Sequence, residues 1–209
     1  MMGLLDGIVA NMFGKATPIA DRSALGRFMD SRAAFLAQKC VVEFCRVRAG
    51  VNWPKLFEED DFQRALAQSR WRSYPPAFAM VAEMVEAALR EPAGLGQRRL
   101  PAALEAVAAD VFAAYAVPQG ESETFWQSAL DEVRERLAAT QSGPPRPVRE
   151  MPDPLARRIF DALPLHRTVV TNDYDYIFNN LRMNLLRAHE DFLAAARLES
   201  LVDDLLGTD

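Results

Sequence analysis

The fold is decided by residues 21–50, which read DRSALGRFMDSRAAFLAQKCVVEFCRVRAG. Apolar side chains recur there every three or four residues, which is the spacing of one face of an α-helix. These side chains are Leu25, Met29, Ala33, Leu36, Cys40, Phe44 and Val47, and Phe28, Phe35 and Val42 widen the stripe. Asp21 or Ser23 can cap the first turn, and Gly50 can end the last one. We therefore predict a long helix that runs to about Arg48 and packs one face into the core.

The same spacing continues along the rest of the chain, with proline and glycine between the apolar segments. Tyr74-Pro75-Pro76 is expected to end one helix and to begin another, which stops before Pro92. A second long helix is predicted to start at Thr171 or Asn172. Shorter helices are predicted at about residues 101–115, 122–139 and 153–163, and residues 198–206 either continue the second long helix or form a last short one.

These patterns predict an all-α protein, because no hairpin turn and no sustained apolar/polar alternation indicates a strand. We expect one compact bundle of about seven to nine helices, in which the two long helices form the central pair. Residues 21–209 form this domain after an amphipathic segment at residues 1–20, and a proline-rich loop lies near residues 141–152. The helices after this loop are too few to bury their own apolar faces, so we expect them to pack against the rest.

The charge balance argues against a nucleic-acid partner. The chain has 24 Lys and Arg against 29 Asp and Glu, which gives a formal net charge of −5. Proteins that bind a phosphate backbone gain most of their affinity from clustered Lys and Arg. Arg64, Arg70 and Arg72 lie close together, but the acidic run at residues 58–61 directly precedes them and opposes their field. We expect no nucleic acid among the partners.

No stretch of the sequence is long and apolar enough to cross a membrane. The longest uncharged stretches, residues 73–82 and 111–120, have ten residues each. A helix of that length spans about 15 Å of a hydrocarbon core of about 30 Å. The first residues also lack the features of a secretory signal. We therefore expect a cytoplasmic protein in which Cys40 and Cys45 are reduced and packed.

The N-terminal segment has an apolar side of its own. That side consists of Leu4, Leu5, Ile8, Val9, Met12 and Phe13. We favour a short helix that docks on the domain or becomes ordered on contact. The alternative is an interfacial helix, formed by residues 1–14, on a membrane or in the groove of a partner. Membrane contact is not favoured, because only Lys15 supplies positive charge there and Asp6 opposes it.

The sequence contains no motif that predicts catalysis or metal binding. Its two histidines, His166 and His189, belong to no His-Glu-x-x-His pattern, and Cys-x-x-Cys is missing. There is no Gly-x-Ser-x-Gly elbow and no glycine-rich phosphate loop. We expect no metal and no cofactor, and we place no catalytic residue.

Polar residues on the second long helix fall into two groups. Asn180, Asn184, Arg187 and Asp191 form an outer stripe that we expect in solvent. Asp175, Asn179, Arg182 and His189 flank the apolar stripe instead. A polar line beside a core face suits a buried hydrogen-bonded network, which we favour, or the wall of a small polar cleft. Those four residues are our candidate ligand-binding residues.

Two segments resemble a known family. Residues 31–39, SRAAFLAQK, and residues 57–62, FEEDDF, are similar to a bacterial family of small helical proteins without an established activity. Some members of that family are labelled esterases. The resemblance covers about the first third of the chain and implies a helical fold. It contains no catalytic motif, so it implies no site residues.

The sequence favours a non-enzymatic interaction or adaptor protein of the bacterial cytoplasm, which binds a protein partner or a second copy of itself. Two alternatives stay open. One is a binding module for a small molecule or lipid, with its cleft beside Asp175, Asn179 and Arg182. The other is a hydrolase whose site we cannot place.

Overall fold

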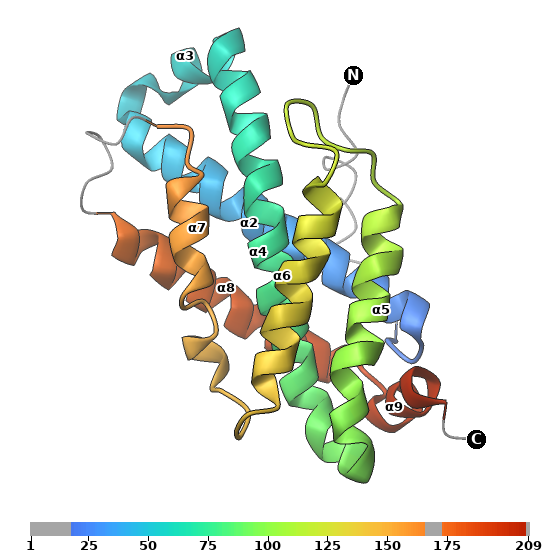
Figure 1. The fold of residues 1–209 in the computed structure, drawn as a ribbon. Helices are drawn as coiled ribbons and strands as arrows, with labels where there is room; N and C mark the ends of the chain where they lie inside the picture. The colour runs from blue at the N-terminus through green and yellow to red at the C-terminus, as the bar shows by residue number, and fades with distance from the viewer. Residues whose placement is uncertain (1–17, 166–172, 208–209) are drawn as a thin grey trace.

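The computed structural model describes residues 18–165 and 173–207, and every regular element in them is a helix. The α-helices, shown in Figure 1, are α2 (Arg22–Ala49), α3 (Trp53–Glu58), α4 (Asp60–Ala93), α5 (Leu100–Ala113), α6 (Phe125–Thr140), α7 (Leu155–Asp161), α8 (Tyr174–Ala195) and α9 (Leu198–Leu206). Short 3-10 helices are η1 (Gly50–Asn52), η2 (Gly94–Arg99) and η3 (Val148–Glu150). The predicted all-α class is confirmed. Residues 1–17 of the predicted N-terminal segment 1–20, and the predicted caps Thr171 and Asn172, lie outside the described residues.

Helix α2 begins and ends where its sequence predicts. The side chain of Asp21 accepts a hydrogen bond from the backbone N–H of Ala24 at 2.7 Å, which satisfies one of the free donors of the first turn. Gly50 ends the helix with a φ of 54°, a conformation that glycine adopts without a steric penalty. The prediction was wrong for Val47, which is 58% exposed. The neighbouring Arg46 and Arg48 are exposed too, because the last turn of α2 extends past the core.

The expected chain break at Tyr74-Pro75-Pro76 is wrong, because α4 continues through it as one helix of 34 residues. A proline inside a helix costs about 3 kcal/mol. Each fully buried valine, methionine or phenylalanine contributes roughly 1.5–3 kcal/mol in the opposite direction. The turns that follow the prolines contain many such side chains, and all of residues 73–86 are buried. Packing on every side of α4 therefore outweighs the lost backbone hydrogen bonds.

The long central pair consists of α2 and α4, which have the largest mutual contact in the described structure. The C-terminal helix α8, expected as the partner of α2, packs on the outside against α2, α4 and α7. In Figure 1, α4 runs through the middle, α5 and α6 lie on one side of it, and α7 and α8 lie on the other. A helix that is buried all round belongs at the centre of a bundle, and residues 73–86 of α4 meet that condition, whereas α8 has exposed residues along its whole length.

The helices after the proline-rich loop pack back onto the first part of the chain, as expected. Helices α7, α8 and α9 all contact α4. Near the C-terminus, Ile19 forms an isolated parallel bridge with Ala196, in the gap between α8 and α9. The backbone N–H of Ile19 donates to Ala195, and the N–H of Arg197 donates back to Ile19, at 3.0 and 2.9 Å. Residues 198–206 therefore form a separate helix.

An aromatic cluster surrounds the first half of α4. Its rings belong to Trp71, Tyr74, Phe78, Phe112, Tyr115 and Trp126, and neighbouring centroids lie 4.8–6.2 Å apart. The hydroxyls of Tyr74 and Tyr115 both donate to the carboxylate of Asp30, at 2.5 and 2.8 Å. We call these three residues the Asp30 network. It joins α2, α4 and the end of α5 through one carboxylate.

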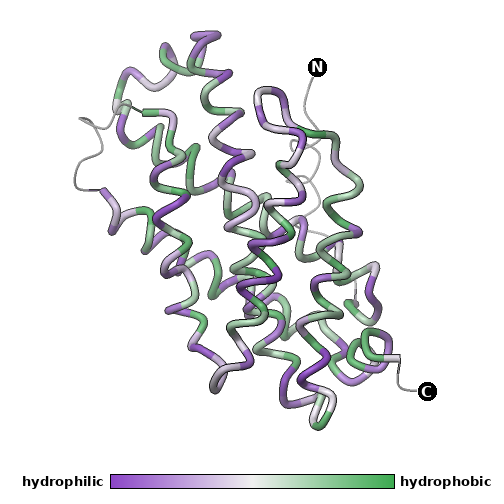
Figure 2. Tube along the Cα trace, viewed as in Figure 1, coloured by the Kyte–Doolittle hydropathy of each residue, from purple (hydrophilic) through white to green (hydrophobic). Residues whose placement is uncertain are grey.

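Hydrophilic and hydrophobic residues both occur along the helices, as the colours of Figure 2 show. Among the described residues, no helix has the length and apolar character needed to cross a membrane.

Candidate functional site

The four predicted ligand-binding residues of α8 do not form one site in the structure. Asp175 and Asn179 are exposed, whereas Arg182 and His189 are half-buried. No hydrogen bond or ion pair within the described residues links one of the four to another. Burial lowers the pKa of His189, and the nearby Glu190 opposes that shift. Neither of the two hollows described below includes them, so their role stays a prediction.

The predicted outer stripe of α8 is wrong at Asn184, which is only 5% exposed. Its side-chain amide donates to the backbone carbonyl of Asn180 at 2.8 Å. Asp191 forms an ion pair with Arg32 of α2 at 3.0 Å. Helix α8 is flanked by α2, α7 and η3, so its buried face is wider than one stripe.

Both thiols are buried and free, as the sequence predicts. Burial raises the pKa of Cys40 and that of Cys45 to about 12. The thiolate, which is the reactive form of cysteine, is therefore scarce at neutral pH. These side chains pack the core and do not suit nucleophilic catalysis.

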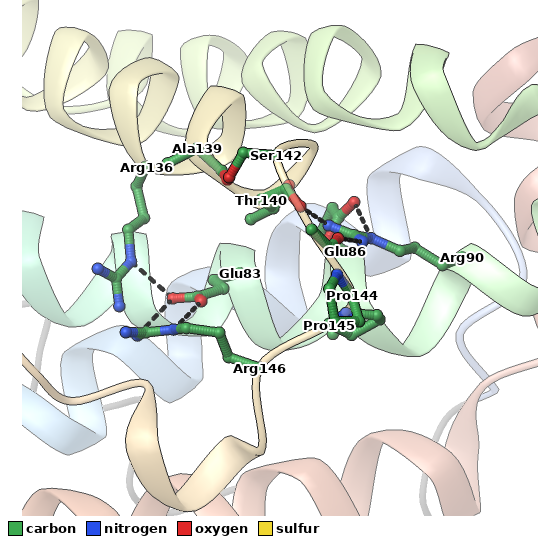
Figure 3. A pocket seen from close by; sticks show the side chains of 12 residues that line it. Glu83, Glu86, Arg90, Arg136, Ala139, Thr140, Ser142, Pro144, Pro145 and Arg146 are labelled. Atoms are coloured by element: carbon green, nitrogen blue, oxygen red, sulfur yellow. Dashed lines mark hydrogen bonds and ion pairs between the residues drawn. The ribbon is translucent and has the colours of Figure 1, made fainter.

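Buried charged side chains surround a cavity of about 170 Å³ between α4, α6 and the start of the proline-rich loop. We call it the α4–α6 cavity, and Figure 3 shows it. Its walls are formed by Glu83, Glu86, Ala87 and Arg90 of α4, by Arg136, Ala139 and Thr140 of α6, and by residues 142–146 of the loop. Two carboxylates and three guanidinium groups thus line one small space.

At one end of the cavity, two arginines hold Glu83, whose side chain is 5% exposed. Nε of Arg136 donates to Oε2 of Glu83 at 2.6 Å, and Nε of Arg146 donates to Oε1 at 2.9 Å. Figure 3 shows the two guanidinium groups approaching the carboxylate from different elements. Burial lowers the pKa of Arg136, whereas the charge of Glu83 opposes that shift. The ion pairs offset the free-energy cost of removing these charges from water.

The same two arginines also fasten the loop. Nη2 of Arg136 donates to the backbone carbonyls of Met151 and Asp153, at 2.6 and 3.1 Å. Nη2 of Arg146 donates to the same two carbonyls, at 3.2 and 3.1 Å. Nη1 of each guanidinium donates no hydrogen bond to any described residue. The loop is therefore anchored while one edge of each guanidinium group stays open.

At the other end, Glu86 is fully buried, with 0% of its side chain exposed. Its Oε1 accepts hydrogen bonds from Nε of Arg90 at 2.7 Å and from the amide of Gln141 at 2.8 Å. Arg90 also donates to the backbone carbonyls of Thr140 and Gly143, which holds the first turn of the loop. Oε2 of Glu86 is buried and accepts no hydrogen bond. One oxygen of this buried carboxylate thus has no hydrogen-bond donor among the described residues.

Sequence reasoning missed the α4–α6 cavity. Glu83, Glu86 and Arg90 recur at spacings of three and four, so they share one face of α4. This pattern lies inside the longest apolar part of the chain. It could have predicted buried ion pairs, because charged residues are rarely buried unless they are paired. The partners Arg136 and Arg146 lie more than fifty residues further along the chain. Nothing local in the sequence connects them to Glu83.

A second hollow, of about 440 Å³, lies between α4, α6 and α7. Burial raises the pKa of Glu132 in its wall, against the opposing charge of Arg158. Arg158 forms an ion pair with Glu132, and Arg72 forms one with Glu121 at 2.8 Å. Both oxygens of Glu132 are nevertheless buried and accept no hydrogen bond, so this hollow, like the α4–α6 cavity, is lined by a buried carboxylate that is not fully hydrogen-bonded.

Among residues 18–165 and 173–207, no group of three or more His, Cys, Asp or Glu side chains could hold a metal ion. No family model matches the chain, and no curated protein or solved structure matches it either. The resemblance of residues 31–39 and 57–62 to small bacterial helical proteins therefore stays a prediction.

Proposed function

We propose that this protein is a binding module for a small polar molecule, which occupies the α4–α6 cavity. The observation that carries the proposal is Oε2 of Glu86, a carboxylate oxygen that is buried at the cavity without a hydrogen-bond donor. An unsatisfied buried acceptor costs about 1–3 kcal/mol, and more when it is charged. We propose that the Glu86 carboxylate turns toward the adjoining cavity when a ligand enters, so that the ligand donates a hydrogen bond to this oxygen and removes that cost.

Size and chemistry support the same proposal. One water molecule takes up about 30 Å³ in the liquid. The cavity of about 170 Å³ therefore has room for a molecule of several heavy atoms. Small-ligand sites combine such a space with a few fixed polar groups. Arg136 and Arg146 are fixed by Glu83 and by the loop carbonyls, so they are already oriented before a ligand arrives.

A pair of substitutions on α6 tests the proposal. Ala138 and Ala139 are adjacent and both exposed, but only Ala139 lines the cavity. Ala139→Phe should fill the cavity, whereas Ala138→Phe is the matched control. The measurement is thermal unfolding of the full chain with amino acids, dicarboxylates, sugar phosphates and polyamines.

We expect at least one of these classes to raise the melting temperature of the wild type and of the Ala138→Phe variant, but not that of Ala139→Phe. At a ligand concentration about 100 times Kd the stabilisation is about 2.7 kcal/mol. For a chain of this size that corresponds to a rise of roughly 5–10 °C. If no class gives a saturable rise, or if the rise persists in Ala139→Phe, the proposal is wrong.

A second candidate function is self-association through the C-terminal end of α2. Val47, Val51 and Trp53 are 58%, 93% and 38% exposed, and they lie within seven residues of one another. Arg46 and Arg48 lie beside them, and the exposed acidic run at residues 58–61 follows. In a twofold dimer the basic side of one copy can face the acidic side of the other. We propose a second copy of the chain as the partner of this surface.

Light scattering coupled to size-exclusion chromatography tests the self-association. We expect a concentration-dependent dimer in the wild type and a monomer in Val51→Asp, because a buried unpaired charge destabilises an interface. Leu95→Asp is the control, since Leu95 is fully exposed at η2 and lies outside this surface. A monomeric wild type at every concentration, or a dimer that Val51→Asp leaves intact, contradicts this candidate.

A further inference from the structure

The carboxylate of Glu86 is closed off in this structure, so the α4–α6 cavity has to open before a ligand can contact it. Its oxygen Oε2 is buried along with the rest of the side chain. Arg90 and Gln141 cover the other oxygen. Two of the walls are the packed helices α4 and α6, and the third is the exposed loop at residues 142–146. The loop is therefore the wall that can move without disturbing the core.

Residues 143–147, which we call the strap, have few backbone ties of their own. No backbone group of residues 143–146 forms a hydrogen bond with another backbone group of the described residues. Three of the five strap residues are proline, which has a fixed φ and no N–H to donate. On either side the chain is fixed, because α6 ends at Thr140 and Met151 is fully buried. The strap is thus a stiff segment between two anchored ends.

Two arginine side chains hold the strap against the cavity. Nη1 of Arg90 donates to the backbone carbonyl of Gly143 at 2.8 Å. Arg146, which belongs to the strap itself, donates from Nε to Oε1 of Glu83 at 2.9 Å. Figure 3 shows Arg146 reaching Glu83 at one end of the cavity while Arg90 lies at the other. Side chains, and not the backbone, therefore keep the strap closed.

Every group that accepts a hydrogen bond from Arg146 also accepts one from Arg136. These groups are the carboxylate of Glu83 and the carbonyls of Met151 and Asp153. Breaking a buried ion pair is costly because it leaves a charge without a partner. When Arg146 leaves, Arg136 stays on Glu83, and Arg146 enters the solvent that already reaches 39% of its side chain, against 14% for Arg136. Release of Arg146 is therefore the least costly way to free the strap.

We infer that the strap is a gate over the α4–α6 cavity and that Arg146 is its latch. When Arg146 releases Glu83, residues 144–147 move outward while Arg90 keeps Gly143 in place. Gly143 suits the hinge, because no atom lies within 4 Å of the position that a Cβ would occupy there. The inference rests on the proposed function, for which it supplies the entry route of the ligand, but the movement itself is measurable without any ligand.

A cysteine placed behind the strap reports its opening. Ala87 lines the cavity from α4 and is half-buried, so Ala87→Cys puts a thiol there. Burial raises the pKa of Cys40 and that of Cys45 to about 12, so the native thiols react slowly. The reagents are methyl methanethiosulfonate, which is small, and N-pyrenylmaleimide, which is bulky, and both are uncharged. Mass spectrometry of the folded full chain at successive times gives the labelling rate of each thiol.

Releasing the latch should speed the bulky reagent more than the small one. In the Ala87→Cys chain, we expect Arg146→Gln to raise the rate of N-pyrenylmaleimide about fivefold and to leave the native thiols unchanged. Arg149→Gln is the matched control, because Arg149 follows the strap, is exposed and does not line the cavity. Raising NaCl from about 0.1 M to about 1 M should also speed labelling of the Ala87→Cys chain, since salt screens a partly exposed ion pair.

The outcomes separate the gate from the proposed function. The gate is wrong if the bulky reagent labels Ala87→Cys equally fast with and without Arg146 and at both salt concentrations. It is also wrong if Arg146→Gln speeds labelling of Cys40 and Cys45 to the same extent, because the side chain then stabilises the whole fold. A ligand that binds in an Ala139-dependent way would leave the binding module standing in either case. If Arg146 controls labelling but no ligand class binds, the proposed function falls and the movement of the strap stands.

Discussion

Helix α4 carries two buried polar networks, and they are completed in different ways. In the Asp30 network, one carboxylate accepts hydrogen bonds from two neutral phenols, both of which come from described residues of the chain. In the α4–α6 cavity, two carboxylates meet three guanidinium groups, and one carboxylate oxygen stays without a donor. The first network is closed and joins helices. The second joins a loop to α4 and leaves an acceptor open, which is the difference between a structural network and a candidate binding site.

Removing Glu83 should give the largest loss of stability in the molecule. Glu83→Ala leaves Arg136 without its carboxylate in a buried position, and breaking a buried ion pair in this way costs about 3–5 kcal/mol. Urea denaturation measures the loss. Glu91→Ala, at an exposed position of α4, is the control and should hardly change the free energy of unfolding. A small effect of Glu83→Ala would show that water replaces the carboxylate and that the network is weaker than the Asp30 network.

Removing the acceptor of the closed network should cost less. Asp30→Ala removes the carboxylate acceptor of the buried Tyr74 hydroxyl and leaves it only the hydroxyl of Tyr115, which costs about 1–3 kcal/mol. The half-buried Tyr115 can turn to water. In a Tyr74→Phe background the same substitution should cost much less, because no buried hydroxyl remains to be satisfied. Equal costs in the two backgrounds would show that Asp30 and Tyr74 do not interact energetically. A double-mutant cycle measures the interaction energy of this pair.

Alkaline pH should weaken the Asp30 network. Burial, followed by the charge of Asp30, raises the pKa of Tyr74 in the folded protein, and the same causes raise that of Tyr115. A raised pKa in the folded state stabilises the protein below pH 10 and loses that contribution as the pH increases further. For Tyr74 the loss is about 1.4 kcal/mol per pH unit above pH 10. Urea denaturation between pH 9 and about 11.5 should show this slope in the wild type and a shallower one in Tyr74→Phe.

Substituting Glu86 should give the smallest effect on stability. Glu86→Gln keeps an acceptor for Arg90 and Gln141, and its second oxygen had no partner to lose. Because the buried Arg90 loses its charge partner but keeps the carbonyls of Thr140 and Gly143, we expect a loss of about 1–2 kcal/mol in the free energy of unfolding. A loss as large as that of Glu83→Ala would mean that Oε2 of Glu86 is satisfied within the protein, and it would remove the contrast between the two networks.

The limits of α2 were predictable because they depend on neighbours in the sequence. Asp21 caps the helix by accepting a hydrogen bond from the N–H of Ala24, three residues further on. Gly50 ends the helix through its own backbone conformation. The continuity of α4 through Pro75 and Pro76 was not predictable in this way. It depends on packing against helices before and after α4 in the chain, chiefly α2 and α6, whereas local propensity favoured a break.

The candidate site illustrates the same limit. Arg136 and Arg146 reach Glu83 across 53 and 63 residues, so no spacing in the sequence relates them. The polar residues of α8 were predicted to bind a ligand because asparagine and aspartate are unusual inside helices. The two glutamates of α4 share a helical face within an apolar stretch, and that pattern is the stronger indicator of a buried charge network.

The bridge between Ile19 and Ala196 has a consequence for synthesis on the ribosome. Ile19 is made early, but the carbonyl and N–H groups with which it pairs belong to residues 195 and 197. The start of α2 depends on the same late region, because the N–H of Arg22 donates to Asp204 at 2.7 Å. Contacts between such distant residues form slowly. The first described turn of the chain can therefore reach its final state only once residues up to Asp204 have left the exit tunnel.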